Sequence, residues 1–248
     1  MNFLELLYSI EPRIAMAITL GLSVAVFTLA SNLAWASRRW TLRSDRQGRF
    51  AIWSSTSRVA RVISYLARWI YYLLIPWGTL MLGWNTTRAL GIWRMDWLTT
   101  AFSFAAIGIS SMLIVIWVWR PYVRTLHPHA VDETGWYWAG QIVETLYQET
   151  HWAFYRSGPV LWLGDFYWGG LFGLLLVLLE GWSNPHARSG VDEVTRADAP
   201  LWRASLLIVS TIVFILTQNS WYALVIHLLL ALAIRRVIGF PFARADHS

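Results

Sequence analysis

Acid–base chemistry is the reaction class that the residues of one segment, 141–158 (QIVETLYQETHWAFYRSG), could perform. In a helix, which advances about 100° per residue, its polar side chains form one stripe. The stripe consists of Gln141, Glu144, Gln148, His151 and Tyr155, with Glu149 and Arg156 at its flanks. Glu and His side chains that lie together in a low-dielectric setting can serve as acids, bases or ligand-binding groups. The structural alternative is that they join neighbouring helices by hydrogen bonds.

The element that must position this stripe is a helix predicted over 136–158. A Trp-rich stretch from Gly135 to Trp138 precedes it, and Gly158-Pro159, a pair typical of helix ends, closes it. A single carboxylate at the centre of a bilayer costs roughly 3 kcal/mol on insertion scales. We therefore expect the stripe to face other helices or water rather than lipid.

Composition places this helix in a membrane protein. Of the 248 residues, 56% are hydrophobic and 14% are charged, and the mean hydropathy is +0.45. A soluble domain would carry about 25% charged residues. We predict one domain over 1–248, an all-α polytopic integral membrane protein with about seven transmembrane helices. The chain has no Cys, which excludes disulfides, thiol nucleophiles and thiolate metal sites.

Hydropathy predicts the seven spans, because about 20 helical residues cross the hydrocarbon. We expect Pro76 to kink the second span. Residues 183–200 are expected to form a surface loop, and residues 218–220 are expected to form the turn of a tight hairpin. The distribution of Arg predicts an N-terminus outside and a C-terminus inside, in a bacterial cytoplasmic membrane. The spans are 14–35, 62–84, 97–119, 136–158, 160–182, 202–217 and 221–234.

The most basic segment, 38–61, follows the first span, and we expect part of it to lie along the membrane interface. Arg58, Arg61 and Arg68 share one face of the helix that enters the second span. Lipid phosphate explains this row, and an acidic protein partner is the alternative. All 20 basic residues are Arg, which excludes lysine Schiff-base chemistry. The basic excess of a membrane protein is directed at anionic lipid, so we predict no nucleic-acid partner.

Two ionisable residues outside the stripe also fall in apolar spans. His227 stands alone in the last span and is expected to hydrogen-bond between helices, while Asp165 is expected to start a helix. A metal site built from Glu144, His151, Asp165 and His227 lacks the His-Glu-x-x-His pattern of helical zinc sites. We predict no metal and no cofactor.

Three short motifs in residues 141–238 resemble those of the CPBP family of intramembrane proteases, which includes the CAAX prenyl-protein endopeptidases. The segment 151–157 (HWAFYRS) resembles the family's Glu-Glu-x-x-x-Arg helix, with Arg156 on the arginine. Phe172 to Leu176 resembles the Phe-x-x-x-His helix. The hairpin TQNSWYALVIHLLLA resembles the His-x-x-x-Asn helix, with His227 on the histidine. The resemblance implies a CPBP-like helix bundle.

The departures from the family pattern fall on its chemistry. The two glutamates are replaced by His151 and Trp152, the second-motif histidine by Leu176, and the asparagine by Ala231. The resemblance implies that a glutamate activates water and that histidines assist peptide hydrolysis. Glu144 or Glu149 could replace the missing base only if the helix were re-registered.

Three functions follow as hypotheses. The first is a non-catalytic scaffold or regulatory protein whose partners are membrane lipids and other membrane proteins. The second is a divergent intramembrane peptidase, with Glu144 or Glu149 as base, His151 and His227 assisting, and Arg156 orienting a carboxylate. The third is an accessory subunit of a pigment or electron-transfer complex, suggested by the 18 Trp and by His227 as an axial ligand.

Overall fold

A computed structural model describes residues 5, 8–41, 57–93, 97–126, 137–192 and 197–238, and the regular structure in these ranges is helical. The helices are α2 (Pro12–Thr41), α4 (Arg58–Trp69), the π-helix η1 (Ile70–Leu74), α5 (Ile75–Met81), α6 (Trp97–Leu126), α7 (Tyr137–Leu163), α8 (Phe166–Ser183), α9 (Pro185–Asp192), α10 (Asp198–Thr217) and α11 (Ser220–Ile238).

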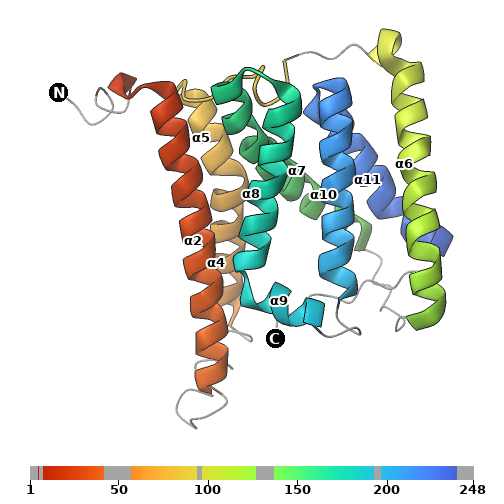
Figure 1. The fold of residues 1–248 in the computed structure, drawn as a ribbon. Helices are drawn as coiled ribbons and strands as arrows, with labels where there is room; N and C mark the ends of the chain where they lie inside the picture. Colours follow the sequence, from red (N-terminus) through yellow and green to blue (C-terminus); the bar gives the residue numbers. More distant parts are fainter. Residues whose placement is uncertain are drawn as a thin grey trace.

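The long helices stand side by side in two layers. Figure 1 shows α2, α8, α10 and α6 in front, with α4–α5, α7 and α11 behind them. Helix α7 is central, because it packs against α8, α11, α2, η1 and α5. The helix that carries the polar stripe is therefore surrounded by other helices.

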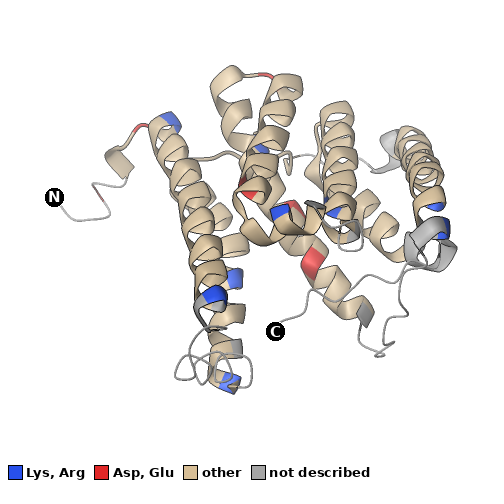
Figure 2. Cartoon of the chain, turned by 60° about the horizontal axis from the view of Figure 1, so that its bottom comes forward, with Lys and Arg blue, Asp and Glu red and all other residues tan. Residues whose placement is uncertain are grey.

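Length and composition identify a membrane protein. Four helical stretches are long and apolar enough to cross a bilayer: Pro12–Ser37, Ala101–Tyr122, Phe166–Ser183 and Ala199–Thr217. Figure 2 shows long stretches of helix without charged residues. Large apolar side chains face outward along them; Phe102 is 87% and Trp117 78% exposed. Such a surface is compatible with hydrocarbon and not with water. Three of the seven predicted spans, 62–84, 136–158 and 221–234, are not among these four.

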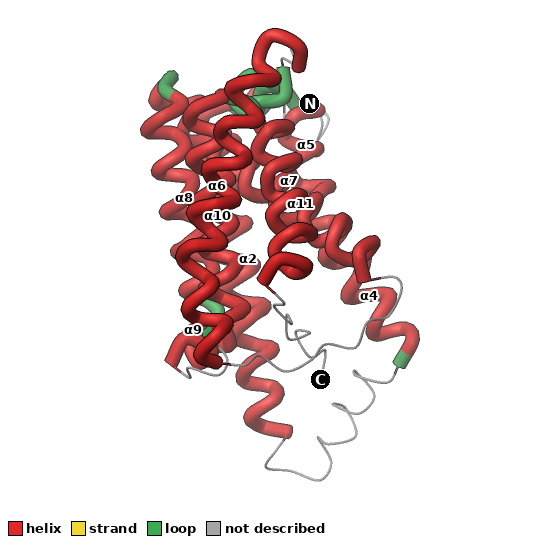
Figure 3. The backbone as a smooth tube through the Cα atoms, turned by 90° about the vertical axis from the view of Figure 1, so that its right-hand side faces the viewer, coloured by secondary structure: helices red, strands yellow, loops and turns green. Residues whose placement is uncertain are grey.

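The predicted irregularity near Pro76 takes the form of a π-helical turn. Proline lacks an N–H and its ring collides with the carbonyl four residues earlier, so it disturbs a regular α-helix at that point. The turn Ile70–Leu74 widens the helix just before Pro76, and the N–H of Ile75 donates to the carbonyl of Ile70. Below this turn, α4 diverges from α11, as Figure 3 shows.

The prediction that Gly158-Pro159 ends the polar helix is wrong, because α7 continues to Leu163. Proline is tolerated inside membrane helices whose neighbours supply polar partners. Gly158 serves close packing instead: a Cβ there would collide with Leu20 of α2. Gly173 of α8 similarly lets α8 approach the backbone of Arg156. Glycine is therefore used here to bring helices together.

The predicted connections are partly correct. The predicted surface loop 183–200 contains a short helix, α9. The hairpin between α10 and α11 is confirmed, and Gln218 turns it with φ 54°. Asp165 starts α8 as predicted, because its carboxylate accepts from the N–H of Trp168 at 2.8 Å. Of the basic segment 38–61, residues 42–56 lie outside the described residues.

Candidate functional site

Two hydrogen-bonded networks lie on different faces of α7. The Glu149 network joins α7 to α10 and α11 and contains Glu149, Arg156, Ser210 and His227. The Glu180 network joins α7 to α2, η1 and α8 and contains Ser23, Tyr71, His151, Tyr155 and Glu180. Sequence spacing predicted one stripe with two flanking charges, whereas the structure divides these residues between the two networks and a third contact of Glu144 and Gln148 with Arg68.

Both carboxylate oxygens of Glu149 have partners in the Glu149 network. Oε1 lies 2.8 Å from Nδ1 of His227. Oε2 accepts from Arg156 at 3.2 Å and from the Ser210 hydroxyl at 2.9 Å. The Ser210 hydroxyl accepts in turn from the second terminal nitrogen of Arg156 at 2.9 Å. All four residues are at most 3% exposed.

Glu149 and Arg156 carry opposite charges, and both side chains come from α7. The two side chains are seven residues apart on α7 and lie on the same face. The Arg156 guanidinium also lies 4.6 Å from the ring centroid of Phe214. Because Arg156 compensates the Glu149 charge, His227 can stay neutral and donate from Nδ1. The Trp152 ring covers His227, with the ring centroids 5.1 Å apart and the planes 6° from parallel.

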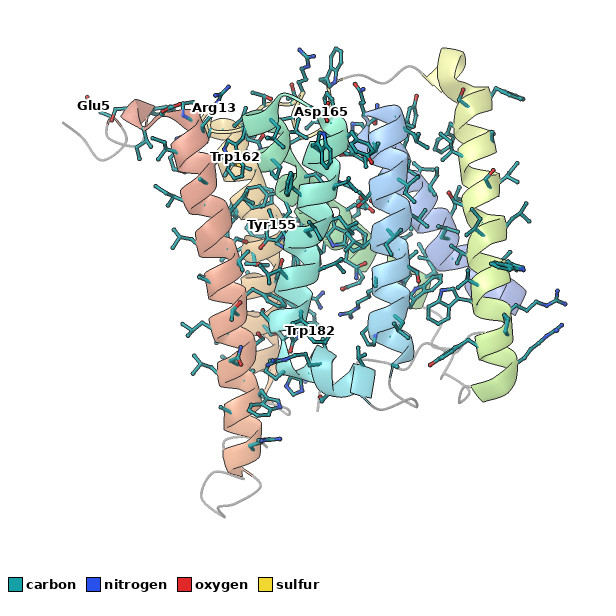
Figure 4. All side chains as sticks on the ribbon, in the orientation of Figure 1. Glu5, Arg13, Tyr155, Trp162, Asp165 and Trp182 are labelled. Atoms are coloured by element: carbon teal, nitrogen blue, oxygen red, sulfur yellow. The ribbon has the colours of Figure 1, made fainter. Side chains whose placement is uncertain are left out.

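The Glu180 network contains His151 as its only basic side chain among the described residues. Glu180 Oε2 lies 2.8 Å from His151 Nε2, and Glu180 Oε1 accepts from the Tyr71 hydroxyl at 3.0 Å. The Tyr71 and Tyr155 hydroxyls are 3.3 Å apart, and Tyr155 donates to the Ser23 hydroxyl at 3.1 Å. Figure 4 shows Tyr155 between the end of the bundle that carries Asp165 and the end that carries Trp182. The network therefore lies deep within the bundle.

A third ionic contact lies nearer the start of α7. Arg68 pairs with Glu144, and each side chain is 31% exposed. Gln148 donates to the other Glu144 oxygen at 3.2 Å. Arg68 thus contacts a carboxylate of the protein rather than projecting only toward lipid. Arg58 is exposed, as a lipid contact requires, and the side chain of Arg61 lies outside the described residues.

The candidate catalytic residues are not brought together at one point. Glu149, Arg156 and His227 meet in one network, His151 belongs to another, and Glu144 to the third contact. The metal set of Glu144, His151, Asp165 and His227 does not assemble: no group of three or more His, Asp or Glu residues in the described part of the chain could hold a metal ion.

Sequence reasoning missed several residues of these networks. Glu180 lies near the end of the predicted span 160–182 and is not among the predicted site residues, whereas it is 4% exposed and lies at the centre of a network. Ser23, Tyr71 and Ser210 were not singled out at all. The available signal was Glu180 itself, an intramembrane carboxylate, since such residues require a named partner.

A groove adjoins the Glu149 network. It has a volume of about 520 Å³ and lies between η1–α5 and α11, with α7 at its floor. Its walls are mostly apolar and include Trp69, Trp77 and Trp221. Glu149 and Thr150 lie at the floor. This volume is in the range of small-molecule and cofactor sites.

No protein-family model, curated protein or solved structure matches the chain. The two networks and the groove are therefore the features that bear on its function.

Proposed function

We propose that this chain is a non-catalytic membrane protein that acts by binding other membrane proteins, as a scaffold or regulatory subunit on a CPBP-like bundle. The contact that carries the proposal is the stacking of Trp152 on His227. In the family that the motifs resemble, position 152 carries a glutamate. An indole ring lying flat on the imidazole occupies the space that a water-activating carboxylate would need.

The other motif positions support the same function. Leu176 packs in an apolar cluster with Phe154 and Tyr155, and Ala231 is 1% exposed. The remaining carboxylate, Glu149, accepts three hydrogen bonds and is paired with Arg156. Each of these partners stabilises the charged form of the carboxylate and occupies a position that a catalytic water would need.

A divergent peptidase is the second candidate, and the groove favours it. Glu149 lies at the groove floor, and His227 is within hydrogen-bond distance of it. A transmembrane peptide in the groove would come close to a carboxylate and an imidazole. General-base action requires one of the three partners of Glu149 to leave so that a water can bind.

Incubation of the purified protein with a library of membrane-spanning peptides separates the two functions. We expect no cleavage. Cleavage that disappears in Glu149→Gln would establish the peptidase and end the scaffold proposal. Asp165→Asn is the matched control, because this exposed carboxylate caps α8 at a distance from the groove.

The proposal includes seven crossings of a bacterial cytoplasmic membrane, with the N-terminus outside. Helices α4–α5, α7 and α11 would cross beside the four long apolar helices. The positions of Arg120, Arg124 and Arg188 at one end of the bundle support this orientation. Because the chain has no Cys, single cysteines introduced at Arg88 and Arg188 can be labelled with a membrane-impermeant thiol reagent. We expect labelling of intact cells at position 88 only.

A further inference from the structure

We infer that the His151–Glu180 pair binds one exchangeable proton, which it receives from the side of the membrane where α7 begins. The inference does not depend on whether the chain acts as a scaffold or as a peptidase. It rests on the composition of the pair, on its burial, and on a file of polar groups that leads to it.

The pair needs a proton in order to be neutral. His151 and Glu180 are 3% and 4% exposed. The groups that face them are the hydroxyls of Tyr71 and Tyr155, the ring of Tyr72 and, beyond Tyr155, Ser23. In the described part of the chain, no Arg lies within ion-pair distance of Glu180. A neutral His151 beside an ionised Glu180 thus leaves one buried negative charge, which is costly.

The imidazole has one nitrogen available for transfer. His151 Nε2 contacts Glu180, whereas Nδ1 is buried without a hydrogen-bond partner. A relaying imidazole accepts a proton on one nitrogen and releases one from the other. A proton from hydronium forms the Nδ1–H bond of His151, the Nε2–H bond breaks, and an O–H bond forms on Oε2 of Glu180. Water is left behind, and the charge of the pair rises from −1 to 0.

A file of polar groups leads along α7 toward this pair. Glu144 is 31% exposed in its pair with Arg68 and accepts from Gln148 at 3.2 Å. Gln148 stands three residues before His151 and therefore shares its face of α7. Beyond Glu180, the file continues through Tyr71 and Tyr155 to Ser23.

Past Tyr155, the path is closed by apolar packing. The buried cluster beside it consists of Met16, Leu20, Phe154 and Tyr155, each at most 4% exposed. A proton that enters from the Glu144 end meets Met16, Leu20 and Phe154 beyond the Tyr155 hydroxyl, and none of these three side chains can carry it further. The site is therefore a one-sided proton-binding site, as a pH-responsive or proton-coupled membrane protein requires.

Infrared difference spectroscopy of the full-length protein in lipid vesicles tests the inference. The external pH is raised from about 6 to about 9, which lowers the proton concentration about a thousandfold. We expect the carbonyl band of one protonated carboxyl group per chain to disappear, and Glu180→Gln to lack this change. Asp165→Asn should retain it. A spectrum of the unaltered protein without any carboxyl band change would overturn the inference.

Two further variants keep the test decisive if Glu180→Gln does not fold. Tyr71→Phe removes one hydrogen bond to Glu180 and should shift the same band to higher frequency; a band that does not move belongs to another group. Gln148→Leu interrupts the file and should slow the response to a pH step at least tenfold. Thr150→Val, at the same depth on another face of α7, is the matched control. Equal rates in these two variants would refute the entry route.

Discussion

The two carboxylates buried beside α7 differ in what neutralises them. Glu149 has a permanent cation, Arg156, and two further donors. Glu180 has a histidine and a tyrosine hydroxyl. Arginine does not release its proton in proteins, whereas histidine does so readily. The Glu149 network therefore contains a permanent ion pair within α7, which Ser210 and His227 join to α10 and α11. The Glu180 network has no permanent cation among the described residues, and its charge can change with the protonation of the pair.

This difference assigns separate tasks to the two faces of one helix. The face with Glu149 connects α7 to α10 and α11 and adjoins the groove. The face with His151 connects α7 to α2, η1 and α8. A scaffold needs the first face to be rigid, and a proton-responsive element needs the second face to be adjustable. Substitutions on the two faces should therefore lower the free energy of unfolding by different amounts.

The largest effect is expected from Arg156→Met, which leaves the Glu149 carboxylate buried without its cation. Breaking a buried ion pair by removal of one partner typically costs about 3–5 kcal/mol. The free energy of unfolding, measured in detergent micelles, should fall by that amount. The double variant Glu149→Gln/Arg156→Met should regain a large part of it. Losses that simply add would contradict the coupling between the two residues.

A smaller loss is expected from His151→Phe on the other face. Glu180 can take up a proton once the histidine is absent, and Tyr71 still donates to it. The cost is then that of a lost buried hydrogen bond, about 1–3 kcal/mol. Thermal unfolding of this variant and of Arg156→Met, side by side, measures the difference. Equal losses would mean that the Glu180 network is as fixed as the Glu149 network.

Much of this arrangement is local and could be predicted. The burial of the polar helix follows from the cost of charges in lipid, and His151, Tyr155 and Arg156 are at most 3% exposed. The hairpin turn at 218–220 and the start of α8 at Asp165 follow from local turn and capping chemistry. These features depend on residues that are near one another in the sequence.

The partners of the polar helix could not be predicted, because they come from distant helices. Ser23 and Tyr155 are 132 residues apart in sequence, and Tyr71 and Glu180 are 109 apart. Helical periodicity assigns a residue to a face but does not say which helix covers it. Glu149 and His151 are two residues apart, so they lie about 200° from each other around the helix. Only the positions of α8 and α11 show that His151 meets Glu180, whereas Glu149 meets His227.

Ser210→Ala should cost less than either charge variant. The hydroxyl donates to Glu149 and accepts from Arg156, but the ion pair remains when it is removed. Single interhelical hydrogen bonds in membrane proteins contribute about 1 kcal/mol, so we expect a loss of that size in the free energy of unfolding. Thr211→Val is the matched control on α10, because the Thr211 hydroxyl donates to the Leu207 carbonyl of its own helix. A greater loss in the control would show that Ser210 does not connect α7 to α10.

The smallest effect is expected from Arg68→Gln, because this ion pair is only partly buried. Arg68 and Glu144 are each 31% exposed, ten times the exposure of His151. Exposed pairs contribute about 0–1 kcal/mol because water and salt compensate each charge. We therefore expect a shift of less than about 1 kcal/mol that diminishes further in high salt. A salt-independent loss as large as that of Arg156→Met would place Arg68 among the buried, fixed cations, and the outer end of α7 would then be as rigid as its centre.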